Sequence, residues 1–420
     1  MPFTALDNTV PASRNISLRW VAVSIFILSS TLNYLDRNLL AVLAPLILSE
    51  FHLKQTGFGL LISAFSFAYA GSSLAVGWFL DRAGINRGIS VAVGWWSAAA
   101  LGSGLVRTLP GLTTCRVALG IGEAAGVPAV GKLNGLYLKA DERALGAALN
   151  QVGLSLGAIL APLWIGIAYR YSWRMPFIAV GVLGFLWIPL WLSISRMIRP
   201  AFASNTGAQY QWTPDSSIAG FRLLLDRRLI LLVIANLLWM GAYSLWSNWI
   251  TLYLINVQGL TLKQTADYVW IPPLISNAGG FFGGWLSQKW MKRGGEAIHS
   301  RCRAVFWSAA GMLITFLLPF ASHPGSATFI ISVSFFFSLA GSVNIYAIPI
   351  DLYGPARSGL AIATLVFAFG LLQTSISPLI GYLADHRLYT AVVWLVTAPP
   401  LVATVVLRRL KQAHYKRIRN

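Results

Sequence analysis

The amino-acid sequence predicts an all-α integral membrane fold of twelve transmembrane helices in two pseudo-symmetric six-helix bundles, with both termini cytoplasmic. Three observations predict this fold. The 420 residues are 56% hydrophobic and only 11% charged, which is far from the composition of a soluble globular domain. Apolar runs of about 20 residues, each long enough to cross a bilayer, recur along the chain. The basic residues gather in alternate segments between these runs.

The net charge of +19 could also indicate nucleic-acid binding. That function needs a clustered basic face with aromatic side chains that stack on bases. The basic residues here are scattered between apolar runs, as short cytoplasmic loops require, so we expect no nucleic-acid partner. Cys115 and Cys302 provide neither a disulfide framework nor a metal-binding pattern, and we expect no metal and no cofactor. The polar first 18 residues lack a signal-peptide pattern, so the first span is expected to direct insertion.

Glycine, proline and charged residues divide the apolar runs into two sets of six predicted spans. The first set lies near residues 19–46, 56–80, 87–107, 110–138, 144–169 and 175–197. The second set lies near residues 229–256, 263–288, 302–322, 326–350, 357–384 and 388–408. The predicted organisation is a cytoplasmic tail, a first bundle, a central cytoplasmic loop, a second bundle and a basic cytoplasmic tail: 1–18, 19–197, 198–228, 229–410 and 411–420.

The distribution of basic residues predicts the orientation of the spans, because cytoplasmic loops carry an excess of lysine and arginine. With both termini inside, most of the 32 basic residues fall in cytoplasmic segments. The opposite side holds only Lys54, Arg107, Arg170, Arg174, Lys263 and Arg387. The two halves also share internal similarity: the Gly-Trp pair at Gly77 is repeated at Gly284, in each case near the end of a span. Parallel six-helix repeats of this kind are typical of alternating-access transporters.

A loop motif after the second span resembles the signature of the major facilitator superfamily. It is formed by Gly77, Asp81, Arg82, Gly84 and Arg87, spaced as Gly-x-x-x-Asp-Arg-x-Gly-x-x-Arg. Its place between the second and third predicted spans is the place it has in that family. The resemblance implies a gating loop, in which Gly77 allows close helix approach and Asp81 holds one state of the gate.

Further motifs resemble the anion:cation symporter family, whose members carry sugar acids such as hexuronates. These motifs are Asn33 to Arg37, Arg116 with Glu123, Trp249 to Leu254, and Pro349 to Leu352. The likeness runs from about residue 18 to residue 400. It implies import of a small organic anion, most simply a hexuronate or related sugar acid, by proton symport. The implied location is the plasma membrane, as a multi-pass protein in the lipid bilayer that acts as a monomer.

Two acidic residues, Asp36 and Glu123, lie deep within predicted spans, and Arg37 and Arg116 lie near them. Intramembrane charge is costly, about 2.5 to 3.5 kcal/mol at the bilayer centre, and therefore usually marks a pathway. Arg116 and Glu123 are seven residues apart and share one helix face. We expect one ring of paired charges, and the pairs Asp36–Arg37 and Arg116–Glu123 could also be purely structural.

A guanidinium group binds a carboxylate through a planar fork, so Arg37 and Arg116 are the expected anion ligands. The resemblance places Tyr34, Tyr69 and Gln151 at the sugar-acid site, and each could instead serve helix packing. The second half is expected to contribute a mostly polar and aromatic wall, with Tyr243, Trp246, Asn248, Asn344 and Gln373 as candidates. Of these we expect Tyr243, Asn344 and Gln373 among the substrate contacts. The carboxy-terminal contacts are less defined, because span eleven lacks the asparagine-bearing run of some family members.

Asp36 and Glu123 are the expected proton-coupling residues. In a low-dielectric cavity the neutral form of Glu123 is favoured, and its protonation would release Arg116 to hold the anion. Sodium is the competing ion, but two carboxylates beside arginines make a poor cation cage.

Other functions remain open at this point. The five histidines lie in loops, helix ends or the tail, which disfavours a membrane enzyme. An exporter or exchanger of another organic anion, or a transporter-like sensor, would share the same sequence features. A channel is disfavoured because paired halves suit alternating access.

Overall fold

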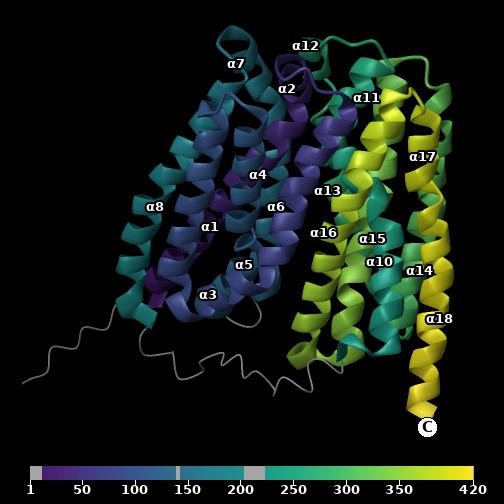
Figure 1. Ribbon diagram of the computed structural model, residues 1–420. Helices are drawn as coiled ribbons and strands as arrows, with labels where there is room; N and C mark the ends of the chain where they lie inside the picture. Colours follow the sequence, from purple (N-terminus) through teal and green to yellow (C-terminus); the bar gives the residue numbers. More distant parts are fainter. Residues whose placement is uncertain (1–11, 139–141, 203–222, 420) are drawn as a thin grey trace, which may run out of the picture.

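The protein is a bundle of long helices that run side by side (Figure 1). The computed structural model describes residues 12–138, 142–202 and 223–419, and every regular element among them is a helix. The apolar composition accounts for this, because a helix satisfies all of its own backbone hydrogen bonds and so tolerates a bilayer. Within these described residues, eight helical segments are long and apolar enough to cross a membrane: Arg82–Leu105, Leu149–Arg170, Arg174–Met197, Arg227–Asn248, Ala297–Phe320, Pro324–Tyr353, Ser358–Asp385 and Tyr389–His414.

The amino-terminal half comprises the elements from α1 to α8. Their bounds are α1 Ala12–Val42, α2 Ala44–Glu50, α3 Gln55–Leu105, α4 Leu109–Glu123, α5 Gly126–Tyr137, α6 Arg143–Leu160, η1 Ala161–Trp164, α7 Ile165–Arg170 and α8 Arg174–Phe202. Two predicted spans, 56–80 and 87–107, form the single element α3, which is kinked at Gly84 with φ of 73°. Only glycine adopts such a φ without strain.

The carboxy-terminal half comprises the elements from α10 to α18. Their bounds are α10 Arg227–Asn248, α11 Ile250–Asn256, α12 Leu262–Thr265, α13 Ile271–Lys292, α14 Ala297–Met312, η2 Leu313–Phe320, α15 Pro324–Tyr353, α16 Pro355–Asp385, α17 Tyr389–Thr397 and α18 Pro399–Arg419. Prolines accompany several of the interruptions, because proline lacks the N–H that continues the hydrogen-bond ladder.

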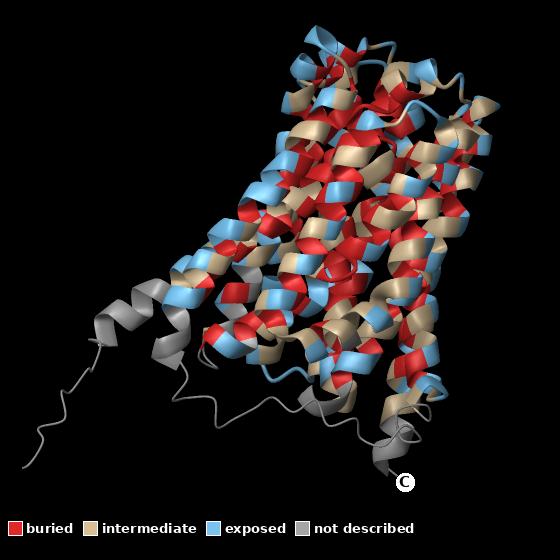
Figure 2. Cartoon of the chain, turned by 60° about the vertical axis from the view of Figure 1, so that its left-hand side comes forward, coloured by how far each residue is buried: buried red, intermediate tan, exposed pale blue. Residues whose placement is uncertain are grey.

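The outer surface of the bundle is apolar. Figure 2 shows exposed residues along the outward faces of the helices, with buried residues concentrated between them. The exposed side chains include large hydrophobic residues such as Leu163, Leu186 and Phe329, which are 71%, 61% and 62% exposed. An apolar exterior, with charged side chains such as Asp36 and Glu123 kept inside, is the arrangement that a lipid environment favours. The chain is a multi-pass membrane protein.

The two halves meet along α3 and α16. The contact begins at the first turn of α3, where Asp385 accepts hydrogen bonds from the Gln55 and Thr56 N–H groups at 2.7 and 3.0 Å. It continues to the Ser63 hydroxyl, which donates to the Thr374 carbonyl at 2.6 Å. The backbones approach closely because a side chain at either Gly59 or Gly381 would collide with the facing backbone.

Further along, α3 and α16 separate. The space around Gly77 in α3 is open, and Figure 1 shows the two halves further apart where α10 begins and α18 ends. We call this end the basic end, because it carries the exposed residues Arg82, Arg293 and Arg408. The end that holds α2, α7, α11 and α12 is the opposite end, and there the halves are joined.

Candidate functional site

Four buried charges form the centre of the amino-terminal half. Arg37 of α1 donates to Glu123 Oε2 through Nε at 3.2 Å and through Nη2 at 2.8 Å. Arg116 of α4 lies 3.8 Å from Asp36 of α1. The expected ring of charges is therefore present, but the partners are exchanged: each ion pair joins α1 to α4 and not neighbours within one helix.

Glu123 lies at the point where its helix is interrupted. α4 ends at Glu123 and α5 begins at Gly126. The preceding glycines let α4 approach α3, because a side chain at Gly120 would collide with the Phe65 carbonyl of α3 and one at Gly122 with the Trp95 ring. Glu123 is fully buried at this position, whereas the Arg37 side chain is 26% exposed. In this ion pair Glu123 is therefore buried, whereas the Arg37 side chain is partly accessible.

Several atoms of the cluster lack a hydrogen-bond partner among the described residues. They are both carboxylate oxygens of Asp36, Oε1 of Glu123, and Nε and Nη2 of Arg116. A buried polar atom without a partner costs about 1 to 3 kcal/mol, and more when it is charged. Apolar packing could replace the cluster at little loss of stability, so its cost argues for a functional role.

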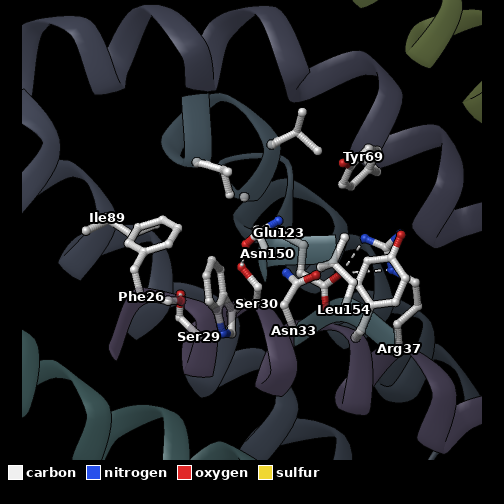
Figure 3. Close-up of a pocket in the computed structure, with 15 residues that line it drawn as sticks. Phe26, Ser29, Ser30, Asn33, Arg37, Tyr69, Ile89, Glu123, Asn150 and Leu154 are labelled. Carbon is white, nitrogen blue, oxygen red and sulfur yellow. Dashed lines mark hydrogen bonds and ion pairs between the residues drawn. The ribbon is translucent and has the colours of Figure 1, made fainter. Parts of the chain in front are cut away.

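The Arg37 guanidinium also lies against three aromatic rings. Its central carbon is 5.0 Å from the ring centre of Tyr34, 4.9 Å from that of Phe65 and 5.0 Å from that of Tyr69. Figure 3 shows Tyr69 and Glu123 near the end of the Arg37 side chain. These cation–π contacts hold the guanidinium from the sides.

A cavity of about 960 Å³ lies between the two halves. Five of the predicted substrate contacts line it: Tyr34, Arg37, Gln151, Tyr243 and Gln373. Trp246 and Asn248, which were expected in the wall of the second half, also line it, together with polar residues that the sequence did not single out, among them Asn38, Ser155 and Asn277. Their only sequence signal is a polar side chain inside an apolar span, which many packing residues share.

A second cavity of about 460 Å³ lies within the amino-terminal half, and Figure 3 shows its lining. It includes Tyr69 and Glu123, and it shares Tyr34 and Arg37 with the larger cavity. At its far side the Ser30 hydroxyl donates to Asn150 Oδ1 at 2.7 Å. The Arg37–Glu123 pair therefore borders both cavities.

Three predicted site residues lie apart from both linings. Arg116 and Asp36 are each 1% exposed, and Arg116 lies over the Phe177 ring at 5.6 Å. The Asn344 amide is fully buried and donates to the Gly283 and Ala340 carbonyls, both at 2.9 Å. In this conformation these three residues are buried and line neither cavity.

The predicted gating loop lies at the basic end. Gly77 is in the first part of α3, Gly84 forms its kink, and Arg82 and Arg87 are exposed on either side. The side chain of Asp81 lies outside the described residues. Close to the loop, Lys132 of α5 donates to the Leu80 carbonyl at 2.8 Å, which ties α5 to α3. Among the described residues, no three histidine, cysteine or acidic side chains gather in a way that could hold a metal ion.

Comparisons with known proteins agree with this geometry. Residues 26–346 match the family model of the Major Facilitator Superfamily. The hexuronate transporter of Escherichia coli (strain K12) is 27% identical over 382 residues, which cover 88% of each chain. The galacturonate transporter of Dickeya chrysanthemi is 28% identical over 286 residues, which cover 66% of this chain and 83% of the relative.

The fold is also that of a solved structure, a bacterial homologue of the human lysosomal transporter Spinster in an inward-facing and unoccupied conformation. The two superpose with a TM-score of 0.71 and 18% sequence identity, over 95% of this chain and 96% of the other. The predicted resemblance to sugar-acid transporters is confirmed, and the family consists of transporters and not of enzymes. The chain belongs to the major facilitator superfamily.

Proposed function

We propose that the protein imports a hexuronate or a related sugar acid together with protons, by alternating access. The observation that carries this proposal is Arg37, a guanidinium that faces a cavity between two halves and is held by a buried carboxylate. This chain aligns with most of the length of relatives that are named hexuronate and galacturonate transporters. They make sugar acids the first substrates to test.

In this proposal Arg37 binds the substrate carboxylate. Its planar fork matches two carboxylate oxygens, and no change in pH removes its charge. Tyr34, Gln151, Tyr243 and Gln373 surround the same cavity and offer neutral donors and acceptors to hydroxyl groups. Tyr69 holds the guanidinium from the side. Arg116 and Asn344 act by positioning: Arg116 holds Asp36, and Asn344 ties α15 to α13.

Glu123 couples proton binding to substrate binding. Its carboxylate occupies the side of the Arg37 fork that an anion would need. Proton binding to Glu123 removes its charge and frees the fork for the substrate. Because Glu123 pairs with Arg37, the arginine that it releases is Arg37 and not Arg116. Linkage then requires that the bound anion also favours proton binding at Glu123.

Alternating access follows from the interface between the halves. They are joined at the opposite end through Asp385 and Ser63, and they separate toward the basic end. We propose that the basic end is cytoplasmic and that this conformation is open to the cytoplasm. In this topology four further spans join the eight apolar segments to make twelve. They are α1 with α2, the first part of α3, α4 with α5, and α12 with α13. A single chain contains the whole site, so a monomer in the plasma membrane suffices.

The test is uptake of labelled galacturonate into proteoliposomes under an inward proton gradient. Wild-type protein should accumulate it above the outside concentration, and a sodium gradient alone should not drive accumulation. Glu123→Gln mimics the protonated carboxyl, so the variant should still exchange external for internal galacturonate. Its gradient-driven accumulation should fall at least about tenfold, because the side chain can no longer bind and release a proton. A tenfold loss corresponds to about 1.4 kcal/mol of coupling.

Glu296→Gln is the matched control, because Glu296 lies at the basic end beside His414 and away from both cavities. It should accumulate galacturonate as the wild type does. Normal accumulation by Glu123→Gln contradicts the coupling scheme. Folded wild-type protein that takes up no sugar acid would favour an exporter or exchanger of another organic anion, or a sensor.

A further inference from the structure

We propose that the cavity selects sugar acids with one carboxylate over those with two, and that Asn248 and Asn277 of the carboxy-terminal half bind the hydroxyl chain. This inference rests on the proposed function and narrows its substrate class. It follows from the number of charges on the cavity wall and from the fixed orientation of these amides.

The first observation is the charge on the wall. Among the described residues that line the 960 Å³ cavity, Arg37 is the only one with a charged side chain. Its charge is balanced by Glu123 in the substrate-free pair. Once Glu123 takes up a proton, the site has one uncompensated positive charge. The second arginine of the cluster is 1% exposed, lies off the lining and faces Asp36. The site therefore balances one carboxylate.

The second observation is the orientation of the asparagines. Asn248 donates through Nδ2 to the Ser244 carbonyl at 2.9 Å, and Asn277 donates through Nδ2 to the Pro273 carbonyl at 2.8 Å. Each carbonyl is four residues earlier in the same helix and can only accept, so the nitrogen of each amide faces the helix backbone. The amide oxygen is thereby turned toward the cavity that the residue lines.

Two further side chains extend this pattern. Asn38 in α1 donates to the Tyr34 carbonyl at 2.7 Å in the same way. The oxygen of Asn277 accepts a hydrogen bond from the Ser155 hydroxyl at 2.5 Å, which bridges the two halves across the cavity. This contact shows that a hydroxyl group reaches the oxygen from the cavity side. A sugar hydroxyl would make the same bond in its place.

A wall of fixed amide oxygens has opposite effects on hydroxyl groups and on carboxylates. Hydroxyl groups donate to such oxygens, whereas a carboxylate has no proton to donate. A second carboxylate on the substrate would lose its hydration and lie against a wall that has no cation. An uncompensated buried charge is far more costly than a buried polar group. The aromatic residues Tyr243, Trp246 and Phe369 on the same wall do not supply that charge.

The test compares two acids that differ at one carbon. Galactonate and galactarate have the same hydroxyl chain, and galactarate carries a second carboxylate where galactonate has a primary alcohol. Unlabelled galactonate and galactarate are added to wild-type proteoliposomes that take up labelled galacturonate. Galactonate should inhibit uptake at concentrations at least about tenfold lower than galactarate, a difference of 1.4 kcal/mol.

Variants then test the wall. Asn248→Lys adds a cation to the carboxy-terminal wall of the cavity that Arg37 also lines. It should lower the galactarate concentration needed for inhibition and raise the galactonate concentration needed. Asn248→Ala and Asn277→Ala should weaken the binding of galacturonate and galactonate. Neither variant should improve inhibition by galactarate. Gln412→Lys adds the same charge at the exposed end of α18 and should leave the order of inhibitors unchanged.

The outcomes separate this inference from the proposed function. Galactarate that inhibits as well as galactonate in the wild type overturns the single-carboxylate site, while uptake of galacturonate still supports a sugar-acid transporter. Alanine variants with unchanged inhibition by galactonate overturn the role of the asparagines. Absence of galacturonate uptake by folded wild-type protein refutes the proposed function itself, and the inference falls with it.

Discussion

Arg37 is held by two kinds of contact that respond differently to a proton. The bonds to Glu123 depend on the charge of the carboxylate, whereas the contacts to Tyr34, Phe65 and Tyr69 depend on the quadrupole of each ring. Proton binding to Glu123 would weaken the first kind and leave the second intact. The guanidinium would then stay in place with a free fork. A site that keeps its geometry while it changes its charge binds an anion with little reorganisation.

Glu50 provides a pH-dependent contact outside the membrane spans. It accepts hydrogen bonds from Arg174 at 2.9 and 2.5 Å and from the Trp173 ring at 2.5 Å. The bonds from Arg174 are the main cause that lowers the pKa of Glu50 below its ordinary value. A lowered pKa stabilises the fold above the unfolded-state pKa of about 4.3, and this contribution is lost as pH falls through the folded-state pKa.

We therefore expect Glu50→Gln to lower the unfolding temperature at pH 7. The loss should be small, on the order of 0.5 kcal/mol, because solvent screens this pair. The difference from wild type should shrink as the pH is lowered below 4. Thermal unfolding in detergent, followed by tryptophan fluorescence at pH 7, 5 and 3.5, measures it. Glu296→Gln controls for the loss of one acidic residue, and a difference that grows toward low pH would contradict the prediction.

At the residue scale, the sequence predicted which residues carry the charges but not how they pair. Asp36 and Glu123 were identifiable because they are rare acidic residues inside apolar spans. The pairing of Arg37 with Glu123 depends on how α1 and α4 are rotated against each other, which no local pattern reveals. Asn248 was expected in the wall of the second half, but Asn277 was missed for a related reason. Whether a polar side chain faces a cavity or a helix neighbour is decided by tertiary packing.

At the scale of elements, the first turn of α3 is capped by the other half of the protein. Lys54 occupies the N-cap position and has no side chain that could accept the free N–H groups of α3. Asp385, at the last position of α16, accepts the Gln55 and Thr56 N–H groups and the Thr56 hydroxyl. A carboxylate is also favoured by the positive end of the helix dipole. The interface is thus stabilised by a cap that exists only while the halves are closed at this end.

Asp385→Asn should loosen this closure. The amide keeps one acceptor but loses the charge, and a hydrogen bond to a charged group contributes about 1.5 to 3 kcal/mol. Amide hydrogen exchange over residues 53–60, measured by mass spectrometry, should become at least about tenfold faster in the variant, because exchange follows the free energy of local opening. Asp267→Asn is the control, since Asp267 is exposed at the same end. Unchanged exchange in Asp385→Asn would show that the cap does not hold the closed end.

Helix positions were largely predictable from apolar periodicity, but helix interruptions were not. The predicted span 110–138 is two helices, α4 and α5, separated directly after Glu123. The residues at this break, Ala124 and Ala125, are good helix formers, so local propensity favours continuity there. The break arises where α4 is held against α3 at Gly122. Most of the predicted central loop 198–228 lies outside the described residues, although α8 extends into it as far as Phe202.

On the scale of the whole molecule, positive charge is strongly polarised. Among the described residues, exposed basic side chains such as Arg82, Arg293 and Arg408 lie at the basic end. Of the basic residues that the structure describes, few lie toward the opposite end, among them Lys54, Arg170 and Lys263, and Arg174 there is paired with Glu50. A charge gradient of this kind sets the direction of insertion, because lysine and arginine remain on the cytoplasmic side.

The proposed orientation, with the basic end in the cytoplasm, predicts which ends of the chain antibodies reach. An epitope tag after Asn420 should bind antibody only in inside-out vesicles, and a tag inserted after Gly259, between α11 and α12, only in right-side-out vesicles. Gly259 suits an insertion because it lies in a turn with φ of 69° and open space around it. Untagged protein and uptake by each tagged protein serve as controls. The reverse pattern would place the basic end outside, and the conformation in which the halves separate at that end would then face outward and suit export instead of import.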